Sequence, residues 1–454
     1  MLFTIHDLIQ LFPNINEDIE KNTAIQSVST DSRQDISDSL FVPIIGETFD
    51  GHDYLLDAIA NGAIAALWEQ SKKIPASLPN GFPLFLVDDT ISALQQLSQY
   101  YRRKINPFVI GITGSNGKTT TKDLVGNILS TTYKTHVTEG NFNNHIGLPL
   151  TILSMPHDTK MLVLEMGMSH AGEIALLSNI AEPDVAIITN IGESHIEYLG
   201  SRENIAKAKL EVLIGLKDKG LLIVDGDEPL LAVKNISHPC VSIGTTGKAD
   251  MSIKDIKLTK NGTDFTIDQK AYHIPLYGIH HAKNAAYAIV LGKHLNIDEH
   301  TIKKALHHPN ITRMRFEMIK GINNVTLIND AYNASPTSMK ASIEVMKQLQ
   351  GYKEKVLVLG DMFELGAEQE EWHRSVAHVI DEDIDALFTI GEYAHMIGEE
   401  VKKQRKQTAC FQVESPHTFL EQMKPFVHKD ALILFKASRG MQLEVWMKRL
   451  LIEE

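Results

Sequence analysis

Cysteine is nearly absent from this sequence, with only Cys240 and Cys410 among 454 residues. Two cysteines cannot build a disulfide framework or a thiolate metal site, which favours a reducing, cytoplasmic location. The chain also lacks any apolar run near the roughly 18 to 20 residues that cross a bilayer, so we expect no membrane insertion. Its N-terminus has neither a basic leader nor a long apolar core, and we expect no signal peptide.

An excess of basic residues is missing too. The sequence holds 44 Lys and Arg against 57 Asp and Glu, a formal net charge of −13. Nucleic acids require a basic surface, so we do not expect them as partners. With 43% hydrophobic and 22% charged residues, the composition is typical of a soluble globular enzyme. The length suggests about three domains.

What the chain does contain is a regular alternation of short apolar runs and helical patterns, which indicates an α/β fold with parallel sheets. We expect three units, at residues 1–104, 105–312 and 313–454. The apolar runs expected to form strands are residues 40–44, 84–87, 161–164, 185–188, 221–224, 325–328, 356–359, 386–390 and 431–435. The last four give the third unit a Rossmann-like pattern.

One segment of the central unit departs from this pattern. Asn261 and Gly262 stand between two stretches of alternating polarity, which is a strong signal for a β-hairpin. We therefore predict a small antiparallel insertion at residues 251–276. In the third unit, Ser335 followed by Pro336 predicts the capped first turn of a helix.

Residues 111–121, Gly-Ile-Thr-Gly-Ser-Asn-Gly-Lys-Thr-Thr-Thr, are the most informative stretch. An expected strand leads in and a helical pattern leads out, so backbone amides and a helix N-terminus can surround a phosphate. Lys118 can reach the terminal phosphates and the Thr119 hydroxyl can bind Mg²⁺. The glycine spacing is irregular, because Ile112 stands where the usual P-loop has glycine. A structural turn is the alternative, but Gly-Lys-Thr in this context favours ATP or GTP binding.

Two polar residues follow the next expected strands. Glu165 ends one apolar run, and His195 lies in the loop after the following run. Parallel α/β sheets bind ligands at this edge, so both are candidate ligands for a metal beside the nucleotide. The alternatives are a capping or surface glutamate and a structural histidine.

Lys209 occupies an apolar position of the expected helix at residues 202–216. It falls four residues after Ile205, in line with the inward stripe, whereas Lys207 faces elsewhere. Burial lowers the pKa of a lysine, and the resulting neutral amine can react with CO₂ to form a carbamate. The alternative is a side chain that extends to solvent. The pattern alone leaves these two open.

Further polar groups follow the strands of the third unit, including Asp330, Asn333 and the segments at residues 360–362 and 436–440. Together they predict one rim facing a cleft. The pair His280 and His281 opens a helix, and adjacent residues do not share a helix face, so a metal site there is not favoured.

These stretches together resemble the Mur ligase family of ATP-dependent amide ligases, across essentially the whole chain. The resemblance implies metal ligands at Thr119, Glu165, His195 and a carbamylated Lys209, and catalytic roles for Lys118, His195, Lys209 and Arg315. It also implies nucleotide contacts from Gly114, Ser115, Asn116, Gly117, Lys118, Thr119, Thr120, Asn284, Arg315, Asp330 and Asn333. ATP and two Mg²⁺ ions would then be the cofactors.

Within the family, residues 332–336, 360–366 and 436–439 resemble the members that join D-alanyl-D-alanine to UDP-N-acetylmuramoyl-tripeptide. Residues 1–104 resemble the uridine-binding domain of these enzymes. The substrate contacts implied by the resemblance are Asp31, Ser32, Thr48, Asn141, Asn144, Ser438 and Arg439. We expect a monomeric enzyme of peptidoglycan precursor synthesis.

Two rival functions remain at this point. Another ligase of the same build, such as a folylpolyglutamate synthase, begins directly with the P-loop domain and would lack residues 1–104. An ATP-binding switch protein without ligase activity would need neither an inward Lys209 nor a polar rim on the third unit. Both features therefore favour the cell-wall ligase.

Overall fold

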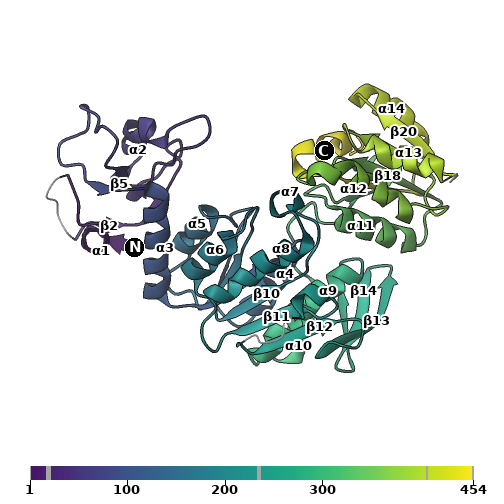
Figure 1. Ribbon diagram of the computed structural model, residues 1–454, viewed down its shortest axis with the longest axis horizontal. Coiled ribbons are helices and arrows are strands. Elements are labelled where there is room, and N and C mark those ends of the chain that lie inside the picture. Colours follow the sequence, from purple (N-terminus) through teal and green to yellow (C-terminus); the bar gives the residue numbers. More distant parts are fainter. Residues whose placement is uncertain (1, 17–21, 233–236, 405–406, 452–454) are drawn as a thin grey trace.

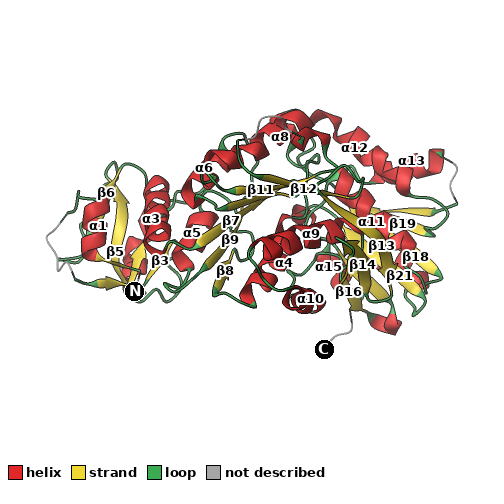
Figure 2. Ribbon diagram, turned by 90° about the horizontal axis from the view of Figure 1, so that it is seen from below, coloured by secondary structure: helices red, strands yellow, loops and turns green. Residues whose placement is uncertain are grey.

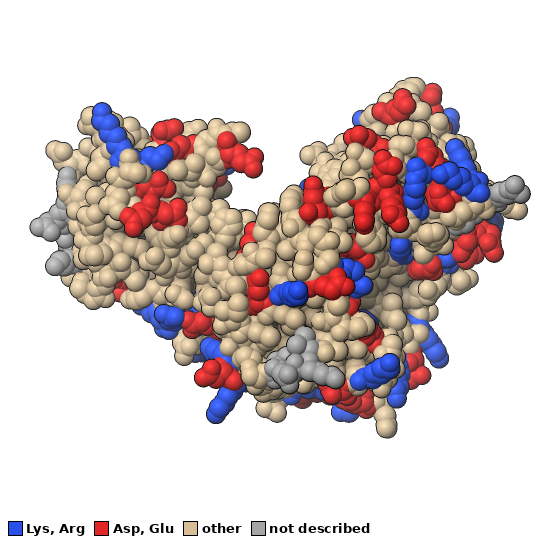
Figure 3. Space-filling model, viewed as in Figure 1, with Lys and Arg blue, Asp and Glu red and all other residues tan. Residues whose placement is uncertain are grey.

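The computed structural model describes residues 2–16, 22–232, 237–404 and 407–451. Its elements form three groups that follow one another along the chain and along the long axis of the molecule (Figures 1 and 2). A space-filling view shows a wide hollow between the first and third groups (Figure 3). This arrangement confirms the predicted three-part α/β fold.

The N-terminal group contains a four-stranded parallel sheet of order β3-β4-β5-β6. Its strands are β3 (Ser27–Ser29), β4 (Ser39–Phe41), β5 (Ala63–Glu69) and β6 (Leu84–Val87), with a separate pair, β1 (Phe3–Thr4) and β2 (Ala24–Ile25). The helices are α1 (Ile5–Leu11), α2 (Leu55–Ala60) and α3 (Thr90–Ile105). Helix α3 joins this group to the central one, and its buried Leu94, Leu97 and Tyr101 share a core with the central α5 and α6.

The central group is built on a nine-stranded sheet of order β15-β14-β13-β12-β11-β10-β7-β9-β8. Its strands are β7 (Phe108–Thr113), β8 (Thr135–Val137), β9 (Met161–Glu165), β10 (Val185–Ile188), β11 (Leu221–Asp225), β12 (Cys240–Gly244), β13 (Met251–Thr259), β14 (Gly262–Ile267) and β15 (Lys270–Ile274). The predicted antiparallel segment is present as β13 to β15. It continues the main sheet, because β13 pairs in parallel with β12.

Helices cover both faces of this central sheet. They are α4 (Lys118–Ser130), α5 (Gly147–Ser154), α6 (Glu173–Ala181), α7 (Ile196–Leu199), α8 (Arg202–Leu210), α9 (Ile279–His294) and α10 (Glu299–His307). Consecutive residues of one strand enter different cores: Ile187 packs with α4 and α9, whereas Ile188 packs with α5, α6 and α8. The predicted helix at residues 202–216 is shorter than expected, because α8 ends at Leu210 and a 3-10 turn follows.

The C-terminal group has a six-stranded sheet of order β16-β17-β21-β18-β19-β20, parallel except for β16. The strands are β16 (Glu317–Lys320), β17 (Thr326–Asn329), β18 (Glu354–Gly360), β19 (Ala386–Ile390), β20 (Ala409–Val413) and β21 (Ala431–Lys436). The helices are α11 (Pro336–Gln348), α12 (Gln369–Ser375), α13 (His395–Lys403), α14 (Pro416–Met423) and α15 (Glu444–Lys448). Ser335 caps α11 as predicted, accepting from the Ser338 amide with Pro336 in the first turn. Within the described ranges, no helix is long and apolar enough to cross a membrane.

Candidate active site

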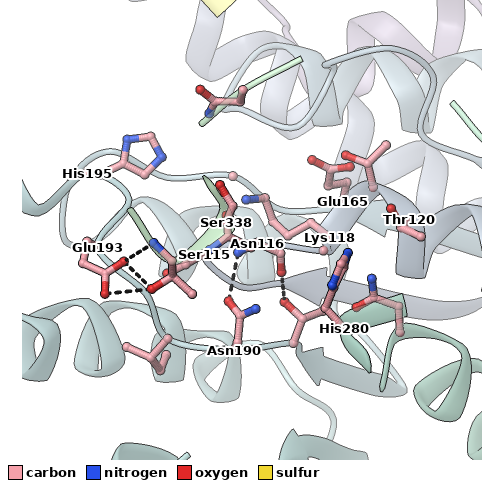
Figure 4. Close-up of a pocket in the computed structure, with 18 of the residues that line it drawn as sticks. Ser115, Asn116, Lys118, Thr120, Glu165, Asn190, Glu193, His195, His280 and Ser338 are labelled. Carbon is pink, nitrogen blue, oxygen red and sulfur yellow. Dashed lines mark hydrogen bonds between the residues drawn. The ribbon is translucent and has the colours of Figure 1, made fainter. Parts of the chain in front are cut away.

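A cavity of about 930 Å³ lies where the carboxyl ends of the central strands meet the C-terminal group (Figure 4). Its walls include most of the residues that the sequence singled out: Ser115, Asn116, Gly117, Lys118, Thr119, Thr120, Asn144, Glu165, His195, Asn284, Arg315, Asp330 and Asn333. These residues are far apart in the chain and meet at this cavity, which is therefore the candidate site. Lys209 is not among the lining residues.

The loop between β7 and α4 depends on two glycines. Gly114 and Gly117 have φ values of +148° and +81°. A Cβ atom on Gly114 would lie 1.9 Å from Thr189 Oγ1, and one on Gly117 would lie 2.6 Å from Asn284 Oδ1. Both positions therefore require glycine for conformation and for space, which gives the irregular spacing a physical reason.

The neighbouring loop after β10 holds this turn in place. The amide of Ser115 donates to the Asn190 carbonyl at 3.1 Å, and the amide of Asn116 donates to Asn190 Oδ1 at 2.9 Å. The Gly192 amide in turn donates to Ser115 Oγ at 2.8 Å. The first-turn amides of α4 have no acceptor within their own helix, so they are available to an anion.

Lys118 begins α4 and points back over the turn, donating to the Gly114 carbonyl at 2.8 Å. Burial lowers the pKa of Lys118; the carboxylate of Glu165 opposes that shift, and Arg315 adds to it. At this position the ammonium group of Lys118 can bind the negatively charged phosphates of a nucleotide.

Glu165 ends β9 with its side chain only 3% exposed. Its Oε1 accepts from Asn143 Nδ2 at 2.7 Å, while its buried Oε2 has no hydrogen-bond partner among the described residues. A buried, unsatisfied carboxylate oxygen is costly, which makes it a candidate ligand atom for a cation.

Lys209 is buried on α8, with 1% of its surface exposed, so the predicted inward orientation is confirmed. Burial lowers the pKa of its amine well below the usual value, and the charge of Lys118 lowers it further. The described residues contain no cluster of three His, Cys, Asp or Glu side chains placed to hold a metal.

His195 stands immediately before α7 in a left-handed conformation, with φ of +64°. Its Nδ1 lies within salt-bridge distance of the Glu364 carboxylate of the C-terminal group, without forming a hydrogen bond. Sequence reasoning noted the stretch around Glu364 but assigned that residue no role. His195 and Glu364 are far apart in the sequence, and no local pattern indicates that they meet.

The C-terminal group reaches the P-loop through several side chains. Arg315 Nη2 donates to Thr119 Oγ1 at 2.9 Å, and its guanidinium lies 4.0 Å over the ring of Tyr332. Ser335 Oγ donates to Asn116 Oδ1 at 3.2 Å. Thr337 Oγ1 donates to Glu193 at 2.7 Å. The two groups thus form one continuous site.

Asp330 organises the rim of the C-terminal sheet. Its carboxylate accepts from Lys436 Nζ and Ser342 Oγ, both at 2.6 Å, and from the Phe316 amide at 3.2 Å. Asn333 is exposed, and its carbonyl also accepts from Lys436, at 3.1 Å. Of the rim expected from the sequence, Asp330, Asn333 and Lys436 line the cavity, whereas residues 360–362 and 437–440 do not.

The residues expected to contact the other substrates are more scattered. Asn144 lines the main cavity, where its Oδ1 accepts from the Gly147 amide at 2.8 Å. Asp31 lines a second cavity of about 570 Å³ between the N-terminal and central groups. The cavity walls do not include Ser32, Thr48, Asn141, Ser438 or Arg439. Arg439 Nη1 instead pairs with Glu444 at 2.5 Å.

His280 and His281 form the first turn of α9, with ring centroids 4.2 Å apart. Burial lowers the pKa of His280 to about 4. In the unfolded chain, His280 takes up a proton near pH 6.5, whereas in the folded protein it does so only near pH 4. The free energy of unfolding therefore falls as the pH is lowered from about 6.5 to 4. Lowering the pH from 7.5 to 5 should reduce the free energy of unfolding by about 2 kcal/mol through His280 alone.

Urea unfolding of the wild type and of His280→Gln at both pH values measures this contribution. We expect the variant to lose less stability on acidification. Parallel losses in the two proteins would contradict a buried, neutral His280.

Known proteins match the whole chain. Residues 24–102 match the model of the Mur ligase family catalytic domain, residues 112–292 the Mur ligase middle domain, and residues 314–439 the Mur ligase glutamate ligase domain. A UDP-N-acetylmuramoyl-tripeptide–D-alanyl-D-alanine ligase of Bacillus subtilis (strain 168) is 47% identical, covering 95% of this chain and 94% of its own. The ligase of the same name from Haemophilus influenzae is 32% identical, covering 94% and 93%.

Solved structures of Mur ligases are also similar to this chain. MurF from Acinetobacter baumannii superposes with a TM-score of 0.89 at 30% identity, covering 99% of this chain and 98% of its own. MurF ligase from Thermotoga maritima in complex with ADP gives 0.83 at 28% identity, covering 94% and 97%. A folylpolyglutamate synthase of Mycobacterium tuberculosis gives 0.61 at 15% identity, covering 79% and 93%, a likeness of fold alone. From the site and from these matches, we conclude that the chain belongs to the Mur ligase family.

Proposed function

We propose that this chain is an ATP-dependent ligase that joins D-alanyl-D-alanine to UDP-N-acetylmuramoyl-tripeptide during peptidoglycan precursor synthesis in the cytoplasm. The observation that carries the proposal is the contact of Arg315 with Thr119, which brings a cation of the C-terminal group onto the P-loop. Relatives with this activity match nearly the full length of the chain. The N-terminal group, at residues 1–104, is proposed to bind the uridine nucleotide, and residues 105–312 and 313–454 to form the other two domains.

The order of the proposed steps follows from the low reactivity of the peptide carboxylate. A peptide carboxylate reacts poorly with amines, so the γ-phosphoryl group of ATP is first transferred to it, giving an acyl phosphate. The amine of D-alanyl-D-alanine then attacks the carbonyl carbon, and phosphate leaves from the tetrahedral intermediate. Lys118 and Arg315 both line the cavity at the P-loop and would stabilise the charge that develops during the transfer.

The residues present fit a divalent cation. Glu165 offers a buried carboxylate oxygen without a partner, and Thr119 offers a hydroxyl at the start of α4. His195 would add an imidazole nitrogen. Mg²⁺, as two ions, would neutralise the phosphates and bring two anions together.

Lys209 completes this set once it is carbamylated. In the unmodified protein two lysines, Lys118 and Lys209, repel each other at a buried site. Attack of the neutral amine on CO₂ forms a carbamate anion and releases one proton. The carbamate would add an anionic oxygen ligand to this set.

The nucleotide would lie across both groups. Asn284 lies close to Gly117 of the P-loop, and Asp330 and Asn333 of the C-terminal group line the same cavity. The remaining proposed substrate contacts, among them Asp31 and Arg439, lie outside this cavity and would be brought to it by movement of the outer groups. A monomer suffices for this proposal, since all the residues come from one chain.

Product analysis tests the function. The protein is incubated with ATP, Mg²⁺, UDP-N-acetylmuramoyl-tripeptide and D-alanyl-D-alanine, and the products are measured by mass spectrometry. We expect UDP-N-acetylmuramoyl-pentapeptide, formed only when the dipeptide is present. Glutamate addition to folate, with no pentapeptide, would instead identify a folylpolyglutamate synthase.

A further inference from the structure

The segment at residues 308–316, called the linker below, joins α10 of the central group to β16 of the C-terminal group. It forms neither helix nor strand. The linker carries Arg315, whose guanidinium donates to Thr119 near the start of α4. The course of the linker therefore affects where this arginine stands relative to the P-loop.

The first half of the linker is fastened to α4. Asn127 Nδ2 donates to the Asn310 carbonyl, and the Asn310 amide donates to Asn127 Oδ1, both at 3.1 Å. The Thr312 amide donates to Asp123 Oδ2 at 2.8 Å. Thr119, Asp123 and Asn127 follow one another at intervals of four residues, so they share one face of α4. This face contacts the linker at three successive points.

Asp123 is itself held by a second contact. Its Oδ1 lies 2.8 Å from Lys122 Nζ, and Lys122 also donates to the Thr138 carbonyl at 2.8 Å. The two side chains are only 4% and 8% exposed. A hydrogen bond from an amide to a carboxylate is stronger than one between neutral groups. Asp123 is therefore a well-fixed acceptor for the Thr312 amide.

The second half of the linker is fastened to the C-terminal group. The Met314 amide donates to Glu317 Oε2 at 3.1 Å, and the Phe316 amide donates to Asp330 Oδ1 at 3.2 Å. Met314 and Phe316 have left-handed backbones, with φ of +64° and +55°, although neither is glycine. Such conformations persist only where the surroundings enforce them, and they concentrate at functional sites. They flank Arg315 on both sides.

We propose that Asp123 and Asn127 are positioning residues, which hold the linker along α4 so that Arg315 reaches the P-loop. They touch no reacting atom and act only through the arginine. The consequence for turnover rests on the proposed function, which assigns Arg315 to the transferred phosphoryl group.

Hydrogen exchange in the ligand-free, full-length protein tests whether the linker is anchored in this way. Asn127→Ala removes both bonds to Asn310 and leaves the buried pair of Lys122 and Asp123 intact. Replacing Asp123 instead would leave Lys122 buried without its counter-charge. For Asn127→Ala, we expect exchange about tenfold faster at residues 308–313, with unchanged exchange in α4 and in the C-terminal sheet.

Asn310→Ala is the matched control. It removes an exposed side chain but keeps the backbone groups that bond to Asn127. Its linker should exchange as in the wild type. Wild-type exchange of the linker in Asn127→Ala would overturn the proposal, and so would faster exchange spread over the whole protein.

Kinetics show whether the anchor acts through Arg315. Asn127→Ala should lower kcat about tenfold and leave the KM for ATP within about threefold, because the P-loop itself is unchanged. In an Arg315→Ala background the same substitution should change kcat by less than about twofold, since the group that it positions is gone. A tenfold loss in both backgrounds would overturn the proposal. Hydrogen exchange requires no substrate, so failure there is distinct from failure of the proposed function.

Discussion

Replacing Lys118 by methionine is expected to lower turnover about 10³-fold. Methionine keeps the length of the side chain but removes the ammonium group that would meet the transferred phosphoryl group. The lysine lines the cavity and is held over the Gly114 carbonyl, at the turn that would surround the phosphates. Steady-state release of phosphate measures the effect.

The control is Lys134→Met. Lys134 pairs with Asp158 at the surface, and its side chain is 67% exposed. Its removal should leave turnover within about twofold, because surface ion pairs contribute little. Comparable losses in both variants would remove Lys118 from the chemistry.

Replacing Lys209 by alanine is expected to reduce turnover by about 10²- to 10³-fold, because the buried amine is the proposed site of the carbamate. The wild type, equilibrated with ¹³C-labelled bicarbonate, should show a carbamate carbon by NMR. That signal should be missing from Lys209→Ala, and added bicarbonate should not restore activity.

Lys207→Ala is the matched control, since Lys207 lies on the same helix but is exposed. It should keep both the signal and the turnover. A fully active Lys209→Ala, or a wild type without the carbamate signal, would contradict the proposed modification.

Much of the fold could be predicted because its signals are local. The buried runs at β9, β10 and β11 are continuous apolar segments, and the Asn-Gly turn marks the hairpin of β13 and β14. Helical periodicity placed Lys209 on the inward stripe but left a side chain extended to solvent as an alternative, and its burial in the structure decides for the inward orientation. The end of α8 was misjudged, because the apolar stripe continues through a 3-10 turn that has nearly the same period.

The parts of the site that escaped prediction depend on contacts between distant segments. Nothing near Glu364 in the sequence indicates that it meets His195, and nothing near Thr337 indicates Glu193. Likewise, the continuation of the hairpin into the main sheet depends on the pairing of β12 with β13. Such contacts arise from the docking of whole groups, which local patterns do not encode.

The central claim is that the P-loop phosphate is transferred to a carboxylate, and isotope transfer tests it most directly. UDP-N-acetylmuramoyl-tripeptide carrying ¹⁸O in the reacting carboxylate is incubated with ATP, Mg²⁺ and D-alanyl-D-alanine. An acyl phosphate retains one labelled oxygen between carbon and phosphorus, and the departing phosphate takes it away. We predict one ¹⁸O atom in each inorganic phosphate released with pentapeptide; unlabelled phosphate would contradict the account.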